Sequence, residues 1–139
     1  MRTLPWPEDS LYSLVVRADF TNDAAWQRIR SEIEAPVGEF RAGVRFVDDP
    51  RFDQLTVGEL LELAEEDPGH FIAFLVDRET LADPEHPILA VDLTEQPGRT
   101  VRVLPKAMWD IQVNIALANT DWESYLEEAD EKGIYRGFL

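Results

Sequence analysis

The sequence predicts an α/β fold: a mixed, mainly parallel sheet of about five strands with helices packed on it, in the order β-α-β-α-β-β-β-α-α. Short apolar runs alternate with segments of helical periodicity through the first half of the chain. Strands linked by such helices connect through right-handed crossovers and pair in parallel, so the first three strands should be parallel. The 139 residues match one ordinary domain, and we expect a single domain over 1–139.

The first strand and the first helix lie between residues 11 and 36. Residues 11–20 predict a strand, and its continuous apolar run at 14–16 indicates burial on both faces. A helix follows, capped by Thr21 or Asn22. Its apolar stripe consists of Trp26, Ile29 and Ile33.

Residues 41–47 alternate between two kinds of side chain, which is typical of a half-exposed strand. One face carries Ala42, Val44 and Phe46, and the other carries Arg41, Gly43 and Arg45. A second helix follows from Val57. Thr56 and Glu59 form a capping box at its start.

Three further strands are predicted in the middle of the chain. Residues 71–76 are uninterruptedly apolar, which favours a central strand buried on both faces. Residues 88–93 and 100–104 flank Gln96-Pro97-Gly98, the pattern of a type II turn. These last two strands should therefore form an antiparallel hairpin.

Two helices and an apolar tail complete the chain. Pro105 begins the first of them, and Asn119 is expected in the left-handed position at its end. Thr120 and Glu123 form a second capping box, which begins the last helix. The tail, residues 134–139, is too apolar to stay free, so we expect it to dock as a short strand or against the core.

Charge limits the classes of partner. Asp and Glu number 28 against 13 Lys and Arg, a formal net charge of −15. That excess repels phosphate backbones and anionic lipid headgroups, so we expect no nucleic acid and no membrane as partner. There is no Cys, which excludes disulfides and thiolate sites. No signal peptide or spanning segment is evident, and a cytoplasmic location is expected. No motif indicates a cofactor or a resident metal.

Acidic residues stand at or near the ends of several predicted strands. They are Asp19, Asp48 with Asp49, Asp77 and Asp92. Ligands bind beyond the carboxyl ends of strands in open parallel sheets, so Asp19, Asp77 and Asp92 form a candidate carboxylate cluster for a divalent cation. The alternative is that each aspartate caps or turns the chain where a strand stops.

Three other residues could carry chemistry. His70 and His86 could act as a base for a nucleophile, but the sequence has no nucleophile elbow, so two solvated histidines are expected. Arg17 and Asp19 share one strand face, which predicts a partly buried ion pair between them. The alternative for Arg17 is a clamp for carboxylate or phosphate.

The C-terminal helices carry a candidate interaction patch, made of Trp109, Asn114, Trp122 and Tyr125. Asn114 lies near the apolar edge of its helix, where it either fixes the packing through hydrogen bonds or lines a pocket. The two tryptophans either belong to the core or rim an interaction surface, and Trp122 is expected in the core. An acidic run covers the outer face of the last helix.

Several stretches together resemble a bacterial family of small acidic single-domain proteins, a domain of unknown function. They are MRTLP at 1–5, LVVRADF at 14–20, LADPEHP at 81–87, AVDL at 90–93 and IALANTDW at 115–122. The resemblance implies a standalone bacterial domain and brings no activity or catalytic residue. Size, acidity and element order are also similar to those of immunity and antitoxin proteins that bind basic toxins.

Two hypotheses about function follow. The leading one is an acidic protein-interaction module, immunity-like or regulatory, with a basic protein as partner and no catalytic set. The alternative is a divalent-metal-dependent enzyme, or a small-ligand binder, that uses the strand-end carboxylates. The sequence leaves open whether the protein is an enzyme, and its oligomeric state.

Overall fold

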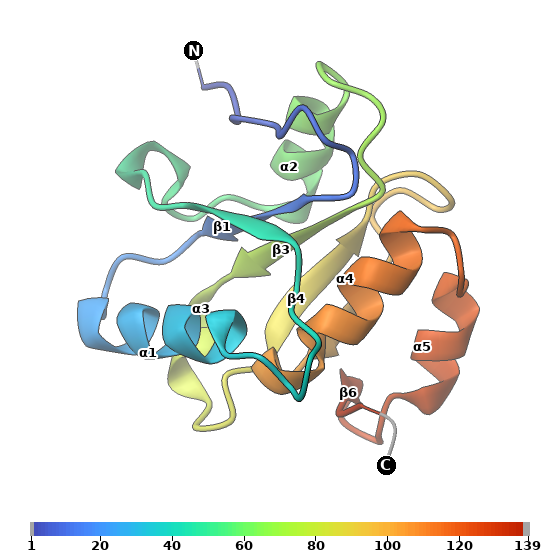
Figure 1. The fold of residues 1–139 in the computed structure, drawn as a ribbon. Helices are drawn as coiled ribbons and strands as arrows, with labels where there is room; N and C mark the ends of the chain where they lie inside the picture. Colours follow the sequence, from blue (N-terminus) through green and yellow to red (C-terminus); the bar gives the residue numbers. More distant parts are fainter. Residues whose placement is uncertain (1, 138–139) are drawn as a thin grey trace.

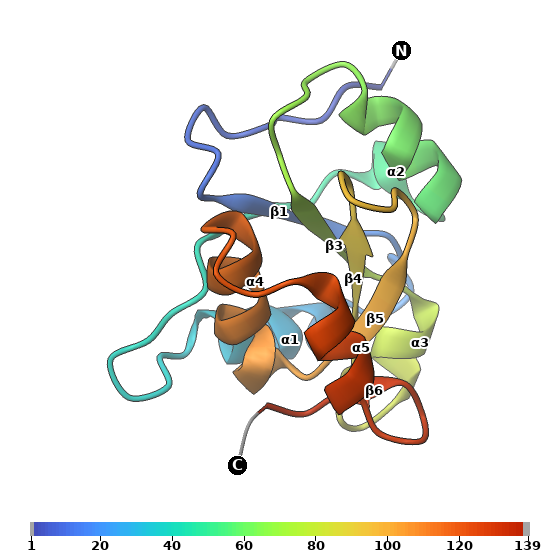
Figure 2. The same cartoon turned by 90° about the vertical axis from the view of Figure 1, so that its right-hand side faces the viewer.

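The computed structural model describes residues 2–137, which fold into a six-stranded sheet with helices on both faces (Figures 1 and 2). The strands are β1 (Ser13–Arg17), β2 (Val44–Val47), β3 (Ile72–Val76), β4 (Ile88–Asp92), β5 (Thr100–Val103) and β6 (Ile134–Tyr135). The helices are α1 (Asp23–Glu34), α2 (Val57–Ala64), α3 (Arg78–Ala82), α4 (Met108–Ala116) and α5 (Trp122–Glu128). Short 3-10 turns at Pro50–Phe52 and Pro105–Ala107 precede α2 and α4.

The sheet order is β2-β1-β3-β4-β5-β6. β1 pairs in parallel with both β2 and β3, while β4 is antiparallel to β3 and β5. The α/β class, the parallel first three strands and the hairpin are thereby confirmed. Two elements extend the predicted order. The polar segment after β3 forms the five-residue helix α3, and the tail adds β6 in parallel to β5. Residues 138 and 139 lie outside the described part.

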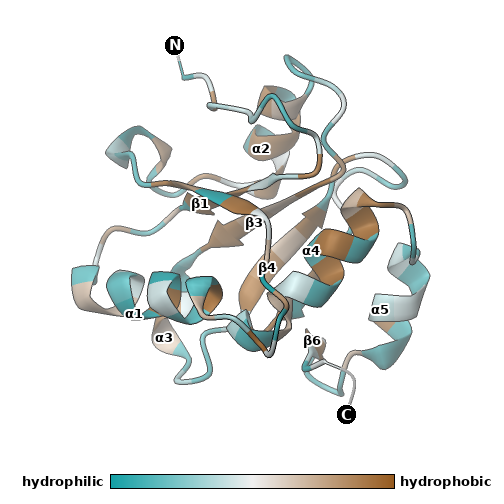
Figure 3. Cartoon of the chain, viewed as in Figure 1, coloured by the Kyte–Doolittle hydropathy of each residue, from teal (hydrophilic) through white to brown (hydrophobic). Residues whose placement is uncertain are grey.

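The sheet separates two hydrophobic cores. α1, α4 and α5 cover one face, where Trp26, Phe74, Met108, Ile111 and Trp122 are buried together. α2 and the N-terminal segment cover the other, with Leu4, Leu14, Phe52, Leu60 and Leu75. Figure 3 shows hydrophobic residues concentrated in β3, β4 and α4, and hydrophilic ones over much of α1 and α5. β1 and β3 are buried along their whole length because both faces are covered.

Two helices, α1 and α2, begin with the caps predicted from the sequence. The amide of Ala25 donates to the side chain of Asn22, which caps α1. The Thr56–Glu59 capping box of α2 forms with both of its hydrogen bonds. The capping box predicted at Thr120 is wrong, because Asp121 caps α5 instead, accepting from the amide of Ser124.

The end of α4 also differs from the prediction. The residue in the left-handed conformation is Ala118, with φ of 57°, rather than Asn119. The amide of Asn119 donates to the carbonyl of Asn114 at 2.8 Å, which is the 6→1 hydrogen bond of a Schellman motif. The ending was therefore predicted one residue too late, and its positive φ falls on a residue with a Cβ atom.

A buried carboxylate holds the C-terminal elements together. Asp110, in the first turn of α4, is 6% exposed. Its carboxylate accepts hydrogen bonds from Tyr125 of α5 at 3.1 Å, from Asn114 at 2.8 Å and from the hydroxyl of Tyr135 in β6. Burial, together with the charge and hydrogen bonding of Asp110, raises the pKa of both tyrosines, so both phenols remain donors at neutral pH.

We expect Tyr135→Phe to lower the unfolding free energy by about 1.5–3 kcal/mol, the range for a hydrogen bond to a charged group. Urea unfolding at pH 7 measures it. Tyr12→Phe is the matched control, because the hydroxyl of Tyr12 makes no hydrogen bond within residues 2–137. A Tyr135→Phe protein as stable as the wild type would contradict the assigned role of Asp110.

Candidate functional site

The structure does not bring the three strand-end carboxylates together. Asp19 and Asp77 follow β1 and β3. These strands are parallel neighbours, so both aspartates lie at the same end of the sheet, where the two strands finish. β4 runs antiparallel, and Asp92 pairs with Ile72 at the opposite end of β3. At ~3.3 Å per residue, Asp92 lies on the order of 16 Å from Asp77 along the strand direction. Asp92 is separated from the other two because β4 runs antiparallel to β3, so the carboxyl end of β4 lies at the opposite end of the sheet.

Each of these carboxylates binds local donors. Asp19 accepts from the amide of Thr21 at 2.9 Å, and Asp92 accepts from the amides of the turn at 94–96 and from Arg99. These contacts correspond to the capping alternative. Within residues 2–137 no group of three or more His, Asp or Glu side chains is arranged to hold a metal ion.

Asp77 combines a helix cap with an ion pair. Asp77 caps α3, because its Oδ1 accepts a hydrogen bond from the amide of Thr80. Arg102 of β5 donates to both carboxylate oxygens of Asp77, at 2.7 and 2.9 Å. Burial alone would raise the pKa of Asp77. The hydrogen bonds and charge of Arg102, with the hydrogen bonds of Thr80, outweigh burial and hold this pKa below its usual value.

Arg17 makes different ion pairs from the predicted one. It is 4% exposed and donates to the backbone carbonyl of Asp19, not to the carboxylate. Its two terminal nitrogens bind Asp23 at 2.5 Å and Asp48 at 3.2 Å. The Asp19 carboxylate is unavailable because it turns back to the amide and hydroxyl of Thr21. The guanidinium thus ties the end of β1 to α1 and to the segment after β2.

The prediction of two solvated histidines is wrong. His70 is 7% exposed and stacks on Trp6 with ring centroids 5.0 Å apart. His86 is 8% exposed, and its Nδ1 lies 3.1 Å from a carboxylate oxygen of Glu32 in α1. Each histidine lies just before a buried strand, where Trp6 stacks on His70 and Glu32 of α1 contacts His86.

The members of the predicted interaction patch are divided. Asn114 and Tyr125 both bind Asp110, so they are structural. Trp109 is half-buried and stacks on Phe40 at 4.3 Å. Trp122 is 1% exposed and belongs to the core, as expected. Trp122 also lines a pocket, which is the candidate functional site.

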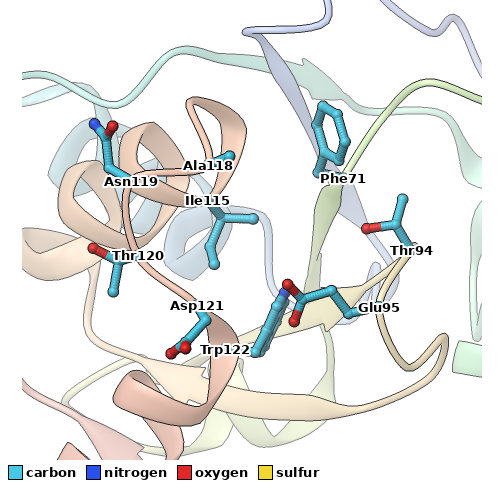
Figure 4. A pocket seen from close by; sticks show the side chains of 9 residues that line it. All are labelled: Phe71, Thr94, Glu95, Ile115, Ala118, Asn119, Thr120, Asp121 and Trp122. Carbon is cyan, nitrogen blue, oxygen red and sulfur yellow. The ribbon is translucent and has the colours of Figure 1, made fainter.

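The pocket, called here the Trp122 pocket, has a volume of about 390 Å³. The α4–α5 turn closes one side, and the start of β3 and the segment after β4 close the other (Figure 4). Its lining includes Phe71, Thr94, Glu95, Ile115, Asp121 and Trp122. A smaller pocket of about 280 Å³ shares Thr94 and includes His70.

The Trp122 pocket combines a buried donor with carboxylates at its rim. The indole Nε1 of Trp122 has no hydrogen-bond partner within residues 2–137, and Figure 4 shows it at the end of the ring that faces the pocket. Glu95 and Asp121 are both exposed. The side-chain and backbone hydrogen bonds of Ser124 hold the pKa of Asp121 below its usual value, so its charge persists at neutral pH.

Within residues 2–137 four other buried side-chain nitrogens have no hydrogen-bond partner. Arg99 Nε, His70 Nδ1 and Trp6 Nε1 lie near the same end of the sheet, and Trp26 Nε1 lies in the core. Arg99 is placed there by its ion pairs to Asp92, Glu95 and Glu123. A pocket with the indole N–H of Trp122 beside it and carboxylates at its rim suits a ligand that offers a hydrogen-bond acceptor together with a cation. Sequence reasoning missed Phe71, Thr94 and Glu95, because nothing in their local pattern says that the α4–α5 turn faces them.

The lowered pKa of Asp77 makes its ion pair testable. An ionised Asp77 stabilises the fold above the ordinary pKa of about 3.9, and this stabilisation is lost as pH falls through the lower folded-state pKa. We expect Asp77→Asn to lose about 1–2 kcal/mol of unfolding free energy at pH 7, and its difference from the wild type to shrink below about pH 4. Urea unfolding from pH 7 to pH 3 measures both, with Asp67→Asn as an exposed control. A difference that is constant with pH would contradict the ion pair.

Within residues 2–137 no helix is long and apolar enough to cross a membrane. No curated protein matches the chain in sequence. Residues 12–138 match the model of a family described as a domain of unknown function (DUF6924), which covers most of the sequence. The chain belongs to this family of uncharacterised domains.

Proposed function

We propose that this protein is a binding module for a basic protein partner, and that the Trp122 pocket receives an arginine or lysine side chain of that partner. The biological role that fits such binding is an immunity-like or regulatory one, in which the partner's basic surface is covered. A pocket of about 390 Å³ lies within the ~300–1,000 Å³ typical of binding sites.

The observation that carries the proposal is the unpartnered indole N–H of Trp122. Leaving a buried donor without an acceptor costs about 1–3 kcal/mol, so proteins rarely retain one without a reason. The ring of Trp122 packs in the core while its nitrogen faces the pocket. A backbone carbonyl of a bound segment would supply the missing acceptor.

The charges around the pocket favour a cation beside that acceptor. Glu95 and Asp121 line the pocket, and Glu123 stands next to it at the start of α5. Arg99 is shared among Asp92, Glu95 and Glu123, so one cation faces several carboxylates. The net charge of −15 adds long-range attraction for a basic partner and raises the rate of encounter.

The test is a nuclear magnetic resonance titration that follows the indole N–H signals of the four tryptophans. The probe is a blocked peptide of alternating arginine and glycine. We expect the Trp122 signal to shift as its N–H gains an acceptor, while the Trp26 signal stays in place. Trp122→Phe assigns the signal and retains an aromatic ring in the core. Binding should weaken with salt, because exposed charges are screened within about 8 Å at physiological ionic strength.

Two comparisons separate specific capture from general attraction. The same peptide with citrulline in place of arginine keeps the shape and hydrogen bonding but lacks the charge, so it should bind far more weakly. Glu95→Gln should weaken binding severalfold, whereas Glu131→Gln, an equal charge change in the turn before β6, should not. Equal binding of both peptides, or a Trp122 signal that stays fixed at about millimolar peptide, would overturn the proposal.

A further inference from the structure

The open edge of the sheet at β2 carries a groove whose local charge is opposite to that of the whole chain. β2 is a terminal strand, and a groove of about 640 Å³ runs beside it. Its lining includes Arg30, Arg41, Arg45, Glu34, Tyr12 and Phe46. We call it the β2 groove. It shares no lining residue with the Trp122 pocket.

Two of these arginines have no carboxylate partner. Within residues 2–137, Arg41 and Arg45 lie more than 4.0 Å from any carboxylate oxygen, and Arg30 contacts Glu34 at a long 3.5 Å. Most other arginines are paired, namely Arg2, Arg17, Arg51, Arg99, Arg102 and Arg136. In a chain with 28 carboxylates and 13 cations, two unpaired arginines that line the same groove favour an anionic ligand.

The backbone of β2 offers hydrogen bonds on the same side. The amide of Ser13 donates to the carbonyl of Gly43, so Gly43 and Arg45 face β1. Val44 and Phe46 therefore turn their N–H and C=O groups away from the sheet, toward the open edge. A strand added there could form main-chain hydrogen bonds with both residues.

Arginines stand on both faces of this edge. Phe46 and Val44 pack toward α1, and Arg30 of α1 lies over the ring of Phe46 at 4.6 Å. Arg45 points to the other face and lies over the ring of Tyr12 at 4.1 Å. Side chains of an added strand alternate between faces, so they would meet Arg30 on one and Arg45 on the other.

The start of β2 is held in place by a buried glutamine. Gln112 of α4 is fully buried and accepts from the amide of Gly43 at 2.7 Å. It also donates to the carbonyl of Leu11 and the hydroxyl of Ser13. A Cβ atom at position 43 would lie 3.2 Å from the side-chain oxygen of Gln112, so any larger residue there would require this buried side chain to shift. The edge is therefore fixed before any ligand arrives, which lowers the entropy lost on binding.

From these observations we propose that the β2 groove binds an extended protein segment rich in carboxylates, which adds a strand to β2. Its backbone pairs with Val44 and Phe46, and its Asp or Glu side chains pair with Arg41, Arg45 and Arg30. Charge complementarity selects this occupant. A second copy of the chain joined through the same edge is disfavoured, because it would bring two sets of unpaired arginines together.

The experiment titrates the full chain with a blocked, fluorescently labelled peptide that alternates glutamate with threonine and valine. Anisotropy gives the dissociation constant, and amide hydrogen exchange reports the edge. We expect the amides of Val44 and Phe46 to become protected at saturating peptide. Arg45→Gln and Arg41→Gln should each weaken binding about fivefold to tenfold, as expected for the loss of one charge-assisted contact. Arg78 is exposed at the start of α3 and has no carboxylate partner among residues 2–137, so Arg78→Gln should leave the dissociation constant unchanged.

Three results would overturn the proposal. Equal affinity for the glutamine version of the peptide would remove the role of charge. Equal affinity for free glutarate, without protection of Val44 and Phe46, would mean a simple anion site and no added strand. Sedimentation of the free chain as a dimer, dissociated by Val44→Pro because that substitution removes an N–H of the open edge, would assign the edge to a second copy. The arginine peptide and this peptide use different sites, so a negative result at the β2 groove does not bear on the proposed function of the Trp122 pocket.

Discussion

The carboxylate of Asp110 is the interaction on which the C-terminal third of the molecule depends. Its oxygens receive hydrogen bonds from α4, α5 and β6, through Asn114, Tyr125 and Tyr135. A buried charge is tolerated only when its lone pairs are occupied by donors, so these elements must stay in register with one another. The position of α5 then places Trp122, whose ring closes the core and whose nitrogen faces the pocket. The pocket is thus a consequence of how one carboxylate is satisfied.

A second constraint organises the rest of the sheet. Where the chain leaves a strand it turns around an aspartate, and a nearby arginine often joins that aspartate to another element. Arg17 links the end of β1 to Asp23 and Asp48, and Arg102 of β5 reaches Asp77 at the start of α3. The Arg17–Asp48 and Arg102–Asp77 pairs join residues 31 and 25 positions apart and are partly buried, so they tie separate elements of the sheet together.

Much of the fold followed from the sequence, because burial on both faces makes β1 and β3 continuous apolar runs and because the Thr56–Glu59 box marks a helix start unambiguously. The candidate carboxylate cluster does not form. Residue types alone do not show whether a strand runs parallel or antiparallel to its neighbour, and the antiparallel direction of β4 places Asp92 at the far end of β3. The surroundings of the two histidines and of Glu95 are formed by residues that lie far away in the sequence. His86 meets Glu32, and Glu95 faces the α4–α5 turn, across separations that no local pattern encodes.

Composition predicts the field of a protein at a distance, whereas recognition is decided within a few ångströms. At physiological ionic strength charges farther apart than about 8 Å are largely screened, so a partner approaching from solution senses the net charge only on the way in. Once in contact it meets either the carboxylates beside Trp122 or the arginines beside β2. An acidic chain can therefore present a basic edge without contradiction. For this chain, the net charge of −15 sets the field that a partner would meet at a distance, and the groups that line the two proposed sites would decide recognition on contact.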